Sequence, residues 1–259
     1  MGRIYGPNAI RDVLATAPGA VREILCTPTI DASEPRLLSQ IASLKIPIRR
    51  VAPDALRERA GSRGGAAIAA EVRDAAQVEL TRLDPDDPTT RTLVALDQVT
   101  DPHNLGAILR SAAVFGACAV IVPKDHAAPL NDAAIRAAAG ASALVPIVRV
   151  TNLARTLREL EARGFWTCAV TGDATADAWS TPLGDRPLCV VLGAEGEGIR
   201  PLVRRACQMS VRIRASGSIQ TLNVSVAAGV ILGEVARQRA AIDDRRSGLN
   251  GGLETTDDA

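Results

Sequence analysis

Aromatic side chains are scarce in this 259-residue sequence and make up only 2% of it. A protein that recognises single-stranded nucleic acid by base stacking needs a row of such side chains, so that mode of binding is excluded. Hydrophobic residues nevertheless make up 47% of the chain, as in ordinary globular proteins. The core must therefore be built from alanine, valine, leucine and isoleucine.

Histidine is equally scarce, and the cysteines are scattered. His103 and His126 are the two imidazoles of the chain, and no cysteines form a CxxC pair. Because structural zinc sites draw on these two residue types, no metal site is expected. Four of the five cysteines lie beside valine, leucine or alanine and are expected to be small buried side chains, and we expect a reducing cytoplasm. The five are Cys26, Cys118, Cys168, Cys189 and Cys207.

The sequence also lacks an N-terminal signal pattern and any apolar run of membrane-spanning length. We therefore expect a cytoplasmic protein with no membrane partner. The net charge is only +1, but residues 200–214 contain five arginines and no acidic residue. An unneutralised cluster of this kind suits an RNA backbone, and a solvated face is the alternative. The five are Arg200, Arg204, Arg205, Arg212 and Arg214.

The order of predicted elements indicates an α/β protein with two domains. Residues 1–73 form a small α/β unit, with helices predicted at 7–16, 34–45 and 53–60 and strands at 21–26, 46–51 and 66–72. Residues 74–90 are polar and interrupted by prolines, which is typical of a linker. The chain from 241 to 259 is charged and glycine-containing, and it is predicted to be a disordered tail.

Residues 91–240 form the second predicted domain. Strands and helices alternate along it, which indicates a parallel sheet covered on both faces. The predicted strands are 91–97, 118–122, 145–150, 165–170, 188–192 and 210–213. The predicted helices are 105–115, 130–138, 152–163 and 222–239.

The first segment that indicates chemistry runs from Leu96 to Gly106. It leaves a strand and enters a helix, so it lies at the carboxyl end of the sheet, where α/β proteins bind ligands. Asn104 falls near the helix N-terminus, and Arg110 follows about 1.7 turns later, so the two do not share a helix face. A loop-positioned Asn104 still allows them to converge. The alternative is a helix cap and a surface arginine.

The second segment joins the strand at 188–192 to a loop with three glycines and two acids, Gly193–Gly198. Glycine permits close approach of a ligand to the backbone. The order GxxGxG differs from the dinucleotide-binding GxGxxG, and no Walker lysine follows. Glu195 and Glu197 favour a cationic or hydroxyl-bearing ligand, such as a sulfonium or a ribose, over a phosphate. A plain tight turn is equally consistent.

The third segment, residues 216–228, leads into the last predicted helix. Thr221, Asn223 and Ser225 stand at the start of an otherwise apolar helix of small residues. Capping of the helix accounts for Thr221, but not for an asparagine inside the first turn. The alanines and glycines that follow permit the close packing that a buried interface uses.

Together, the three segments resemble the signature motifs of the SpoU/TrmH family of RNA ribose 2′-O-methyltransferases. The matching stretches occur in the family's order: DPHNLGAILRSA at 101–112, VLGAEGEGI at 191–199 and TLNVSVAA at 221–228. The resemblance covers residues 91–240. It implies S-adenosylmethionine as the cofactor, a trefoil knot at the end of the parallel-sheet domain, and a homodimer that buries the last helix.

The resemblance also implies roles for individual residues. The catalytic group carried over by motif is Asn104, Arg110, Glu195, Thr221 and Asn223. The positions whose backbone would hold the cofactor are Gly193, Ile213 and Leu222. Two positions depart from the family pattern, since Thr221 stands where a serine is usual and Arg214 where a proline is common. The hydroxyl is kept, but the threonine methyl needs room.

The N-terminal unit, with Ile4–Ala9, resembles the small ribosomal-protein-like RNA-binding domain of family members that methylate a guanosine of 23S rRNA. That makes 23S rRNA the expected partner, although Gly61–Ala67 does not match the family pattern closely. Four alternatives stay open: a tRNA 2′-O-methyltransferase, an rRNA enzyme that methylates an adenosine, a catalytically idle RNA-binding protein of the same fold, and a nucleotide-binding oxidoreductase.

Overall fold

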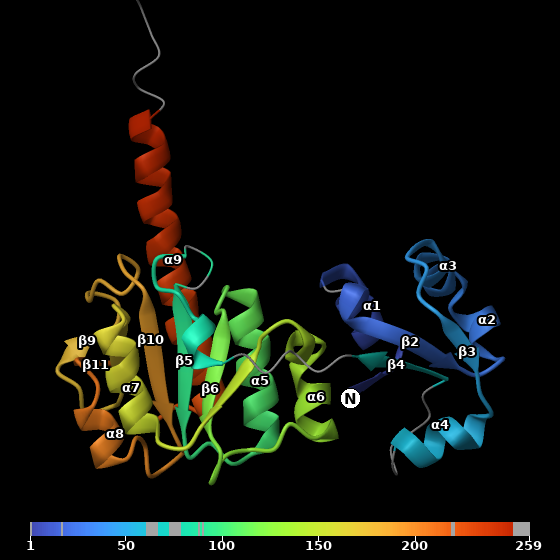
Figure 1. Ribbon diagram of the computed structural model, residues 1–259, viewed down its shortest axis with the longest axis horizontal. Helices are drawn as coiled ribbons and strands as arrows, with labels where there is room; N and C mark the ends of the chain where they lie inside the picture. Colours follow the sequence, from blue (N-terminus) through green and yellow to red (C-terminus); the bar gives the residue numbers. More distant parts are fainter. Residues whose placement is uncertain are drawn as a thin grey trace, which may run out of the picture.

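The computed structural model describes residues 2–16, 18–60, 67–72, 79–87, 89, 91–218 and 221–250. The described chain forms a smaller N-terminal and a larger C-terminal α/β unit, which confirms the predicted fold class (Figure 1). The predicted linker at 74–90 lies partly outside the described residues. Its described part packs on the larger unit, where Leu83 is buried and the Arg163 guanidinium donates to the carbonyl oxygens of Leu80 and Leu83.

The smaller unit is a mixed four-stranded sheet in the order β1-β4-β2-β3, with helices packed against it. Its strands are Gly2–Tyr5 (β1), Val21–Cys26 (β2), Ile48–Arg50 (β3) and Ile68–Val72 (β4). Its helices are Pro7–Thr16 (α1), Ile30–Ser33 (α2), Pro35–Ser43 (α3) and Pro53–Ala60 (α4). The sequence does not predict β1, because four residues are too few to show an alternating pattern; pairing with β4 specifies it instead.

The larger unit is a seven-stranded parallel sheet in the order β7-β6-β5-β10-β8-β11-β9. Its strands are Thr92–Asp97 (β5), Ala119–Pro123 (β6), Ile147–Val150 (β7), Trp166–Val170 (β8), Ala176–Asp177 (β9), Leu188–Gly193 (β10) and Met209–Arg212 (β11). Its helices are Pro102–Val114 (α5), Asp132–Ala138 (α6), Leu153–Ala162 (α7), Pro201–Arg205 (α8) and Val224–Asn250 (α9). The short elements β9 and α8 are not predicted from the sequence.

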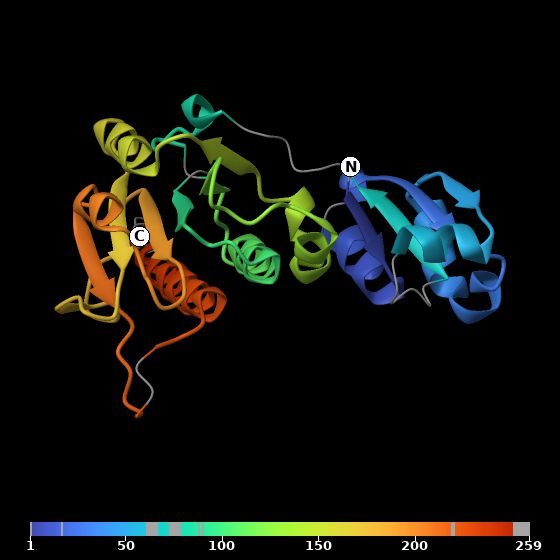
Figure 2. The same ribbon diagram turned by 90° about the horizontal axis from the view of Figure 1, so that it is seen from below.

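Helices cover both faces of the large sheet, as its uninterrupted apolar strands predict. Along β5 the side chains alternate between two cores: Val94 and Leu96 pack with residues of α5, α6 and α9, whereas Leu93 and Ala95 pack with residues of α7 and α8. Figure 2 shows α5 and α9 on one side of the sheet and α7 on the other. The carboxyl ends of the central strands are thereby fixed relative to α5, α8 and α9.

The last helix, α9, continues to Asn250, well past the predicted end at 239, and projects beyond the sheet (Figure 1). The prediction of a disordered tail is therefore wrong for residues 241–250, while 251–259 lie outside the described residues. A charged run continues a helix when its side chains face solvent and bond to the preceding turn. Arg245 does so, since its Nε donates to the Ala241 carbonyl oxygen at 2.8 Å.

Helix α6 connects the two units. Its Ile135 belongs to the core of the smaller unit, and a Cβ on Gly140 would come within 2.2 Å of Val13 Cγ2. Helix α6 also packs closely on α5, because a Cβ on Gly106 would lie 2.3 Å from the Ala134 carbonyl oxygen. The helix that carries Asn104 is thus linked, through α6, to the smaller unit. The trefoil knot stays a prediction of the resemblance.

Candidate active site

The three segments singled out in the sequence meet at the carboxyl edge of the large sheet. Strands β5 and β10 are parallel neighbours, and Asp97 and Gly193 occupy paired positions at their ends. The segment after β5 enters α5, the segment after β10 forms the glycine loop 193–199, and the N-terminus of α9 lies against both. Ligands bind at this edge in α/β proteins because neighbouring loops diverge there.

Three of the predicted catalytic side chains are hydrogen-bonded to one another. The amide Nδ2 of Asn104 donates to Glu195 Oε1 at 3.0 Å. The amide Nδ2 of Asn223 donates to Asn104 Oδ1 at 3.0 Å and also to Glu195 Oε1. Each of the three side chains comes from a different segment, so the contacts tie α5, the glycine loop and α9 together.

Asn223 has a second function, because it caps α9. Its Oδ1 accepts from the backbone N of Ser225 at 2.8 Å, which satisfies a free N–H of the first turn. The capping role considered for Thr221 therefore belongs to Asn223. Asn104 is not a cap either, since Asp101 caps α5 by accepting from the His103 N at 2.9 Å.

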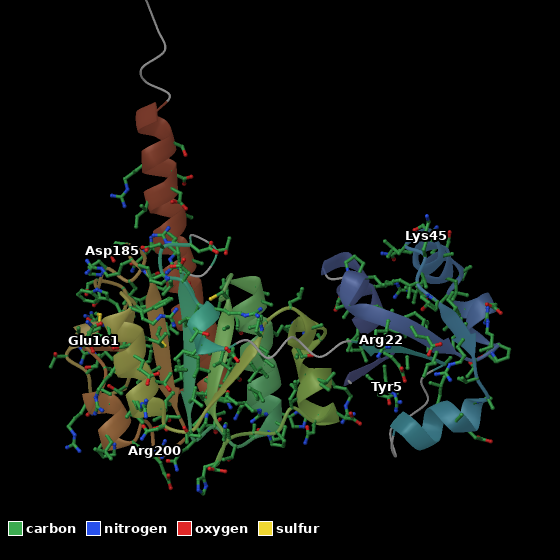
Figure 3. The ribbon with its side chains drawn as sticks, viewed as in Figure 1. Tyr5, Arg22, Lys45, Glu161, Asp185 and Arg200 are labelled. Atoms are coloured by element: carbon green, nitrogen blue, oxygen red, sulfur yellow. The ribbon has the colours of Figure 1, made fainter. Side chains whose placement is uncertain are left out.

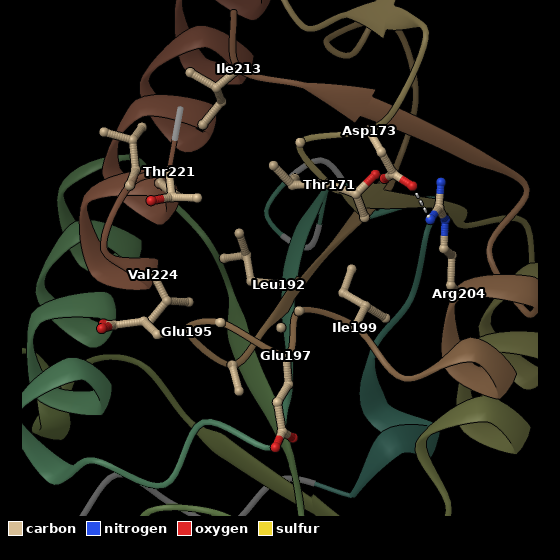
Figure 4. Close-up of a pocket in the computed structure, with 18 residues that line it drawn as sticks. Thr171, Asp173, Leu192, Glu195, Glu197, Ile199, Arg204, Ile213, Thr221 and Val224 are labelled. Carbon is tan, nitrogen blue, oxygen red and sulfur yellow. Dashed lines mark hydrogen bonds and ion pairs between the residues drawn. The ribbon is translucent and has the colours of Figure 1, made fainter. Parts of the chain in front are cut away.

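A pocket of about 440 Å³ lies beside this trio, between the glycine loop and the chain that leads into α9. All three positions assigned to cofactor binding line it, together with Thr221 and Glu195; the three are Gly193, Ile213 and Leu222. Figure 4 shows apolar side chains such as Leu192 at its centre. The Glu195 and Glu197 carboxylates point away from that centre, and Glu195 points toward α5. Both glutamates belong to the lining of the pocket, but their carboxylates lie at its edge and not at its centre.

The glycine loop is a tight turn that also forms the pocket wall, so the two interpretations of it are compatible. The loop closes through paired backbone bonds between Ala194 and Gly198. A Cβ on Gly193 would lie only 2.1 Å from the carbonyl carbon of Gly198, and Gly198 itself has a φ of +68°. Glycine is required at both positions, the first for close approach and the second for its backbone conformation.

The structure does not bring Arg110 into contact with the trio. Asn104 lies within α5 and not in a loop, so the six-residue spacing leaves the two side chains about 120° apart around the helix. Arg110 is exposed, and within the described ranges it makes no hydrogen bond or ion pair. Its predicted role stays a prediction.

The arginine cluster at 200–214 is largely neutralised, so the prediction of an unneutralised patch is wrong. Its partners come from elsewhere in the chain: Arg200 pairs with Asp97, Arg204 with Asp173, and both Arg212 and Arg214 with Asp177. Hydrogen bonds from the last two guanidinium groups lower the pKa of Asp177 to about 2. Arg205 is exposed and has no ion-pair partner in the part of the chain that the structure describes.

Sequence reasoning missed one wall of the pocket, the one at the end of β8. Val170–Asp173 line it, and Asp173 accepts from Arg204 Nη1 at 2.7 Å across its edge (Figure 4). The hydrogen bond from Arg204 lowers the pKa of the Asp173 carboxyl. The signal was available, because 171–173 follow a predicted strand at the same edge of the sheet.

The cysteines contribute no reactive group to this site. Burial raises the pKa of Cys118 to about 11 and those of Cys168 and Cys207 to about 12, so these thiols stay protonated. Among the described residues, no three His, Cys, Asp or Glu side chains gather to hold a metal ion, and no helix is long and apolar enough to cross a membrane.

The fold and the convergence of these three motifs define a class of protein. The chain belongs to the SpoU rRNA Methylase family, whose model matches residues 91–233. It is 43% identical over 241 residues to the 23S rRNA (guanosine-2′-O-)-methyltransferase RlmB of Photobacterium profundum, covering 91% of this chain and 97% of that protein. The RlmB of Vibrio parahaemolyticus is 41% identical over 92% of this chain and 97% of its own length.

Solved structures agree with this family. The SpoU methyltransferase AviRb from Streptomyces viridochromogenes, in complex with the cofactor AdoMet, superimposes with a TM-score of 0.72 at 26% identity. The match covers 92% of this chain and 90% of that one. Because both units are included, the similarity extends beyond the methylase domain to the N-terminal unit.

Proposed function

We propose that this protein methylates the ribose 2′-hydroxyl of a guanosine in 23S rRNA, with S-adenosylmethionine as the methyl donor. The observation that carries the proposal is the hydrogen-bonded trio of Asn104, Glu195 and Asn223 at the edge of the glycine-walled pocket. A relative named for this reaction, matched along 97% of its length, supports the choice of RNA and nucleotide.

The pocket fits S-adenosylmethionine in size and in chemistry. Its volume of about 440 Å³ lies in the range of pockets that hold small ligands, about 300–1,000 Å³. Leu192, Ile199 and Ile213 provide apolar surface for a flat ring, and the backbone of the glycine loop provides hydrogen-bonding groups. When bound, the cofactor supplies a methyl group on a positively charged sulfur, which is already activated for transfer to an oxygen.

The chain must then mainly hold the ribose hydroxyl in line with that methyl group. The Glu195 carboxylate accepts from both amides, which fixes the orientation of Asn104 and Asn223. Each amide carries both donor and acceptor atoms, so the pair can orient a hydroxyl from either side. Thr221, at the rim of the pocket, offers a further hydroxyl in the role that the family gives to serine.

We assign Arg110 to binding the RNA and not to accepting the proton that the ribose 2′-hydroxyl loses on methylation; that proton passes to water. A guanidinium stays protonated at neutral pH and offers five N–H donors, which suits a phosphate next to the target ribose. Its exposure on α5 leaves those donors accessible to RNA. We therefore expect Arg110 to position the substrate backbone.

The proposed assembly is a cytoplasmic homodimer that buries α9, without metal or membrane partner. Val114 on α5 and Val226 on α9 are 70% and 49% exposed in the single chain, and a partner subunit would cover such apolar side chains. Light scattering of the purified chain tests the dimer, and a monomer at micromolar concentration would contradict it.

Methyl transfer from labelled S-adenosylmethionine tests the proposed reaction. We expect label in 23S rRNA, on a guanosine ribose, and none in tRNA. The variant Arg110→Ala should lose the label while keeping cofactor affinity. Arg158→Ala is the control, because it removes an exposed arginine of α7, on the other face of the sheet. Label in tRNA would favour the tRNA enzyme, and label on an adenosine would favour the other rRNA alternative. A wild-type protein that binds no S-adenosylmethionine would overturn the proposal in favour of an idle RNA-binding protein.

A further inference from the structure

The most deeply buried charge next to the site belongs to a residue that does not line the pocket. Asp97, at the end of β5, has no exposed side-chain surface. Among the described residues, Arg200 alone donates to its carboxylate: Oδ2 accepts from the backbone N at 2.8 Å, and Oδ1 accepts from Nε at 2.9 Å and Nη2 at 2.6 Å. Three hydrogen bonds compensate for the removal of this charge from water.

These bonds bring the two ends of the glycine loop to the same residue, Asp97. At one end of the loop, Gly193 occupies the strand position paired with Asp97. At the other end, Arg200 binds the Asp97 carboxylate and begins α8. The segment 194–199 therefore begins beside Asp97, through strand pairing, and ends on it, through hydrogen bonds. The loop between carries Glu195 of the trio and Ile199 of the pocket wall.

The same pair also fixes a second wall. Arg200 is the residue from which α8 starts, and Arg204, one turn further, donates to Asp173 at the pocket edge. Figure 3 places Arg200 at the carboxyl edge of the large sheet, next to α8. Because 44% of the Arg200 side chain is exposed, this residue can be replaced without opening the core.

We propose that the Asp97–Arg200 pair is a positioning device that holds the glycine loop in its cofactor-binding conformation. The inference deepens the proposed function and depends on it, since the pocket is taken to hold S-adenosylmethionine. An ion pair with one buried partner, such as Asp97, is a weak source of stability, because the cost of removing that charge from water offsets the attraction. An ion pair with fixed hydrogen bonds does hold its two residues in one geometry. Here it fixes the position of Arg200, at the end of the glycine loop, relative to the end of β5.

The test is cofactor affinity, measured by calorimetric titration of the full chain with S-adenosylmethionine. We expect Arg200→Ala to raise the Kd about tenfold or more, the size of one lost charge-assisted hydrogen bond. Arg200→Lys, which keeps the charge and the backbone bond, should restore part of the affinity. The Kd for 23S rRNA should change by less than about twofold, because Arg110 and the smaller unit are untouched.

Arg205→Ala is the matched control, since it removes an exposed arginine of α8 that has no ion-pair partner among the described residues. It should leave the cofactor Kd unchanged. Asp97→Asn should resemble Arg200→Ala, and the double variant should lose no more affinity than either single one, because both changes remove the same contact. If Asp97→Asn does not fold, the comparison of Arg200→Ala with Arg200→Lys carries the test.

Two results separate the failure of this inference from that of the proposed function. Wild type that binds the cofactor with the same Kd as Arg200→Ala would overturn the positioning role and leave the proposed function intact. Equal losses of cofactor and RNA affinity, in step with a lower melting temperature, would reduce the pair to a structural contact and would overturn the inference as well. Wild type that binds no S-adenosylmethionine would overturn both.

Discussion

Replacement of Gly193 by alanine tests the pocket most directly, because the clash it creates is with backbone alone. The added Cβ would lie 2.1 Å from the Gly198 carbonyl carbon, 2.2 Å from its oxygen and 2.4 Å from the N of Ile199. No side-chain rotation relieves that overlap. Ordinary contact begins near 3.4 Å, so the loop must retreat by about 1.3 Å. Over-packing of this kind costs about 1–3 kcal/mol. Because the cofactor needs the loop in its original position, binding must reverse the retreat and supply that free energy, which corresponds to about 5- to 150-fold in affinity.

We therefore expect the Kd of Gly193→Ala for S-adenosylmethionine to rise by at least about tenfold in calorimetric titration. Gly19→Ala is the matched control, because a Cβ there meets no atom within 4 Å. It should bind the cofactor like wild type. If Gly193→Ala bound the cofactor with wild-type affinity, the glycine loop would not form the binding wall, and the assignment of the pocket would be refuted.

Three further results are expected. Asn223→Asp keeps the oxygen that caps α9 but puts a second carboxylate beside Glu195, so methyl transfer to 23S rRNA should fall about a hundredfold with little loss of stability. Gly106→Ala drives α5 from α6 and should lower the unfolding free energy by about 1–3 kcal/mol in urea titration. Asp177, with its pKa lowered to about 2, contributes stability that is complete above the unfolded pKa of about 3.9 and is lost as the pH falls through 2. The melting temperature of Asp177→Asn should accordingly be lower at pH 7 and fall less than that of wild type on acidification.

Each of these has a clear contrary outcome. Wild-type activity in Asn223→Asp would show that the trio does not orient the substrate. A Gly106→Ala protein as stable as the Gly19→Ala control would mean that α5 and α6 separate without cost. If wild type and Asp177→Asn lost melting temperature in parallel between pH 4 and 2, the arginine pairs of Asp177 would not contribute to stability, and the acid sensitivity would belong to other carboxylates.

The strands and most helices were predictable because local pattern determines them. β5 and β10 are buried on both faces, so they appear in the sequence as uninterrupted apolar runs. The edge strands β1 and β9 have no such pattern, since their pairing partners specify them. The length of α9 was underestimated for a related reason: its solvent-facing last turns have the composition of a disordered segment, and composition does not register bonds to the preceding turn.

The candidate site divides in the same way. That the three motifs lie at one edge of the sheet follows from their positions after strands and before helices. Contacts across the chain do not follow: Asn104 meets Glu195 from 91 residues away, and Arg200 meets Asp97 from 103 residues away. The family resemblance places Asn104 and Glu195 in one catalytic group, but it does not indicate which of their atoms bond. It indicates nothing of the pair formed by Arg200 and Asp97. A count of charges within 200–214 predicts an open basic patch, because the acids that pair with most of these arginines lie elsewhere in the chain.

These contacts also indicate which side chains of the site are held in place by the protein itself and which become ordered only when the substrate binds. Asn223 caps α9 with its oxygen and bonds to Asn104 and Glu195 with its nitrogen, so the start of the helix and the register of the trio are set by one side chain. Nothing in the described chain holds Arg110 in the same manner. In the proposed reaction, this is the expected division: the groups that orient the hydroxyl are preorganised, which lowers the entropic cost of transfer, whereas the group that grips a phosphate becomes ordered when RNA arrives. The loss caused by Arg110→Ala should accordingly appear mainly in the KM for RNA, and that caused by Asn223→Asp mainly in kcat.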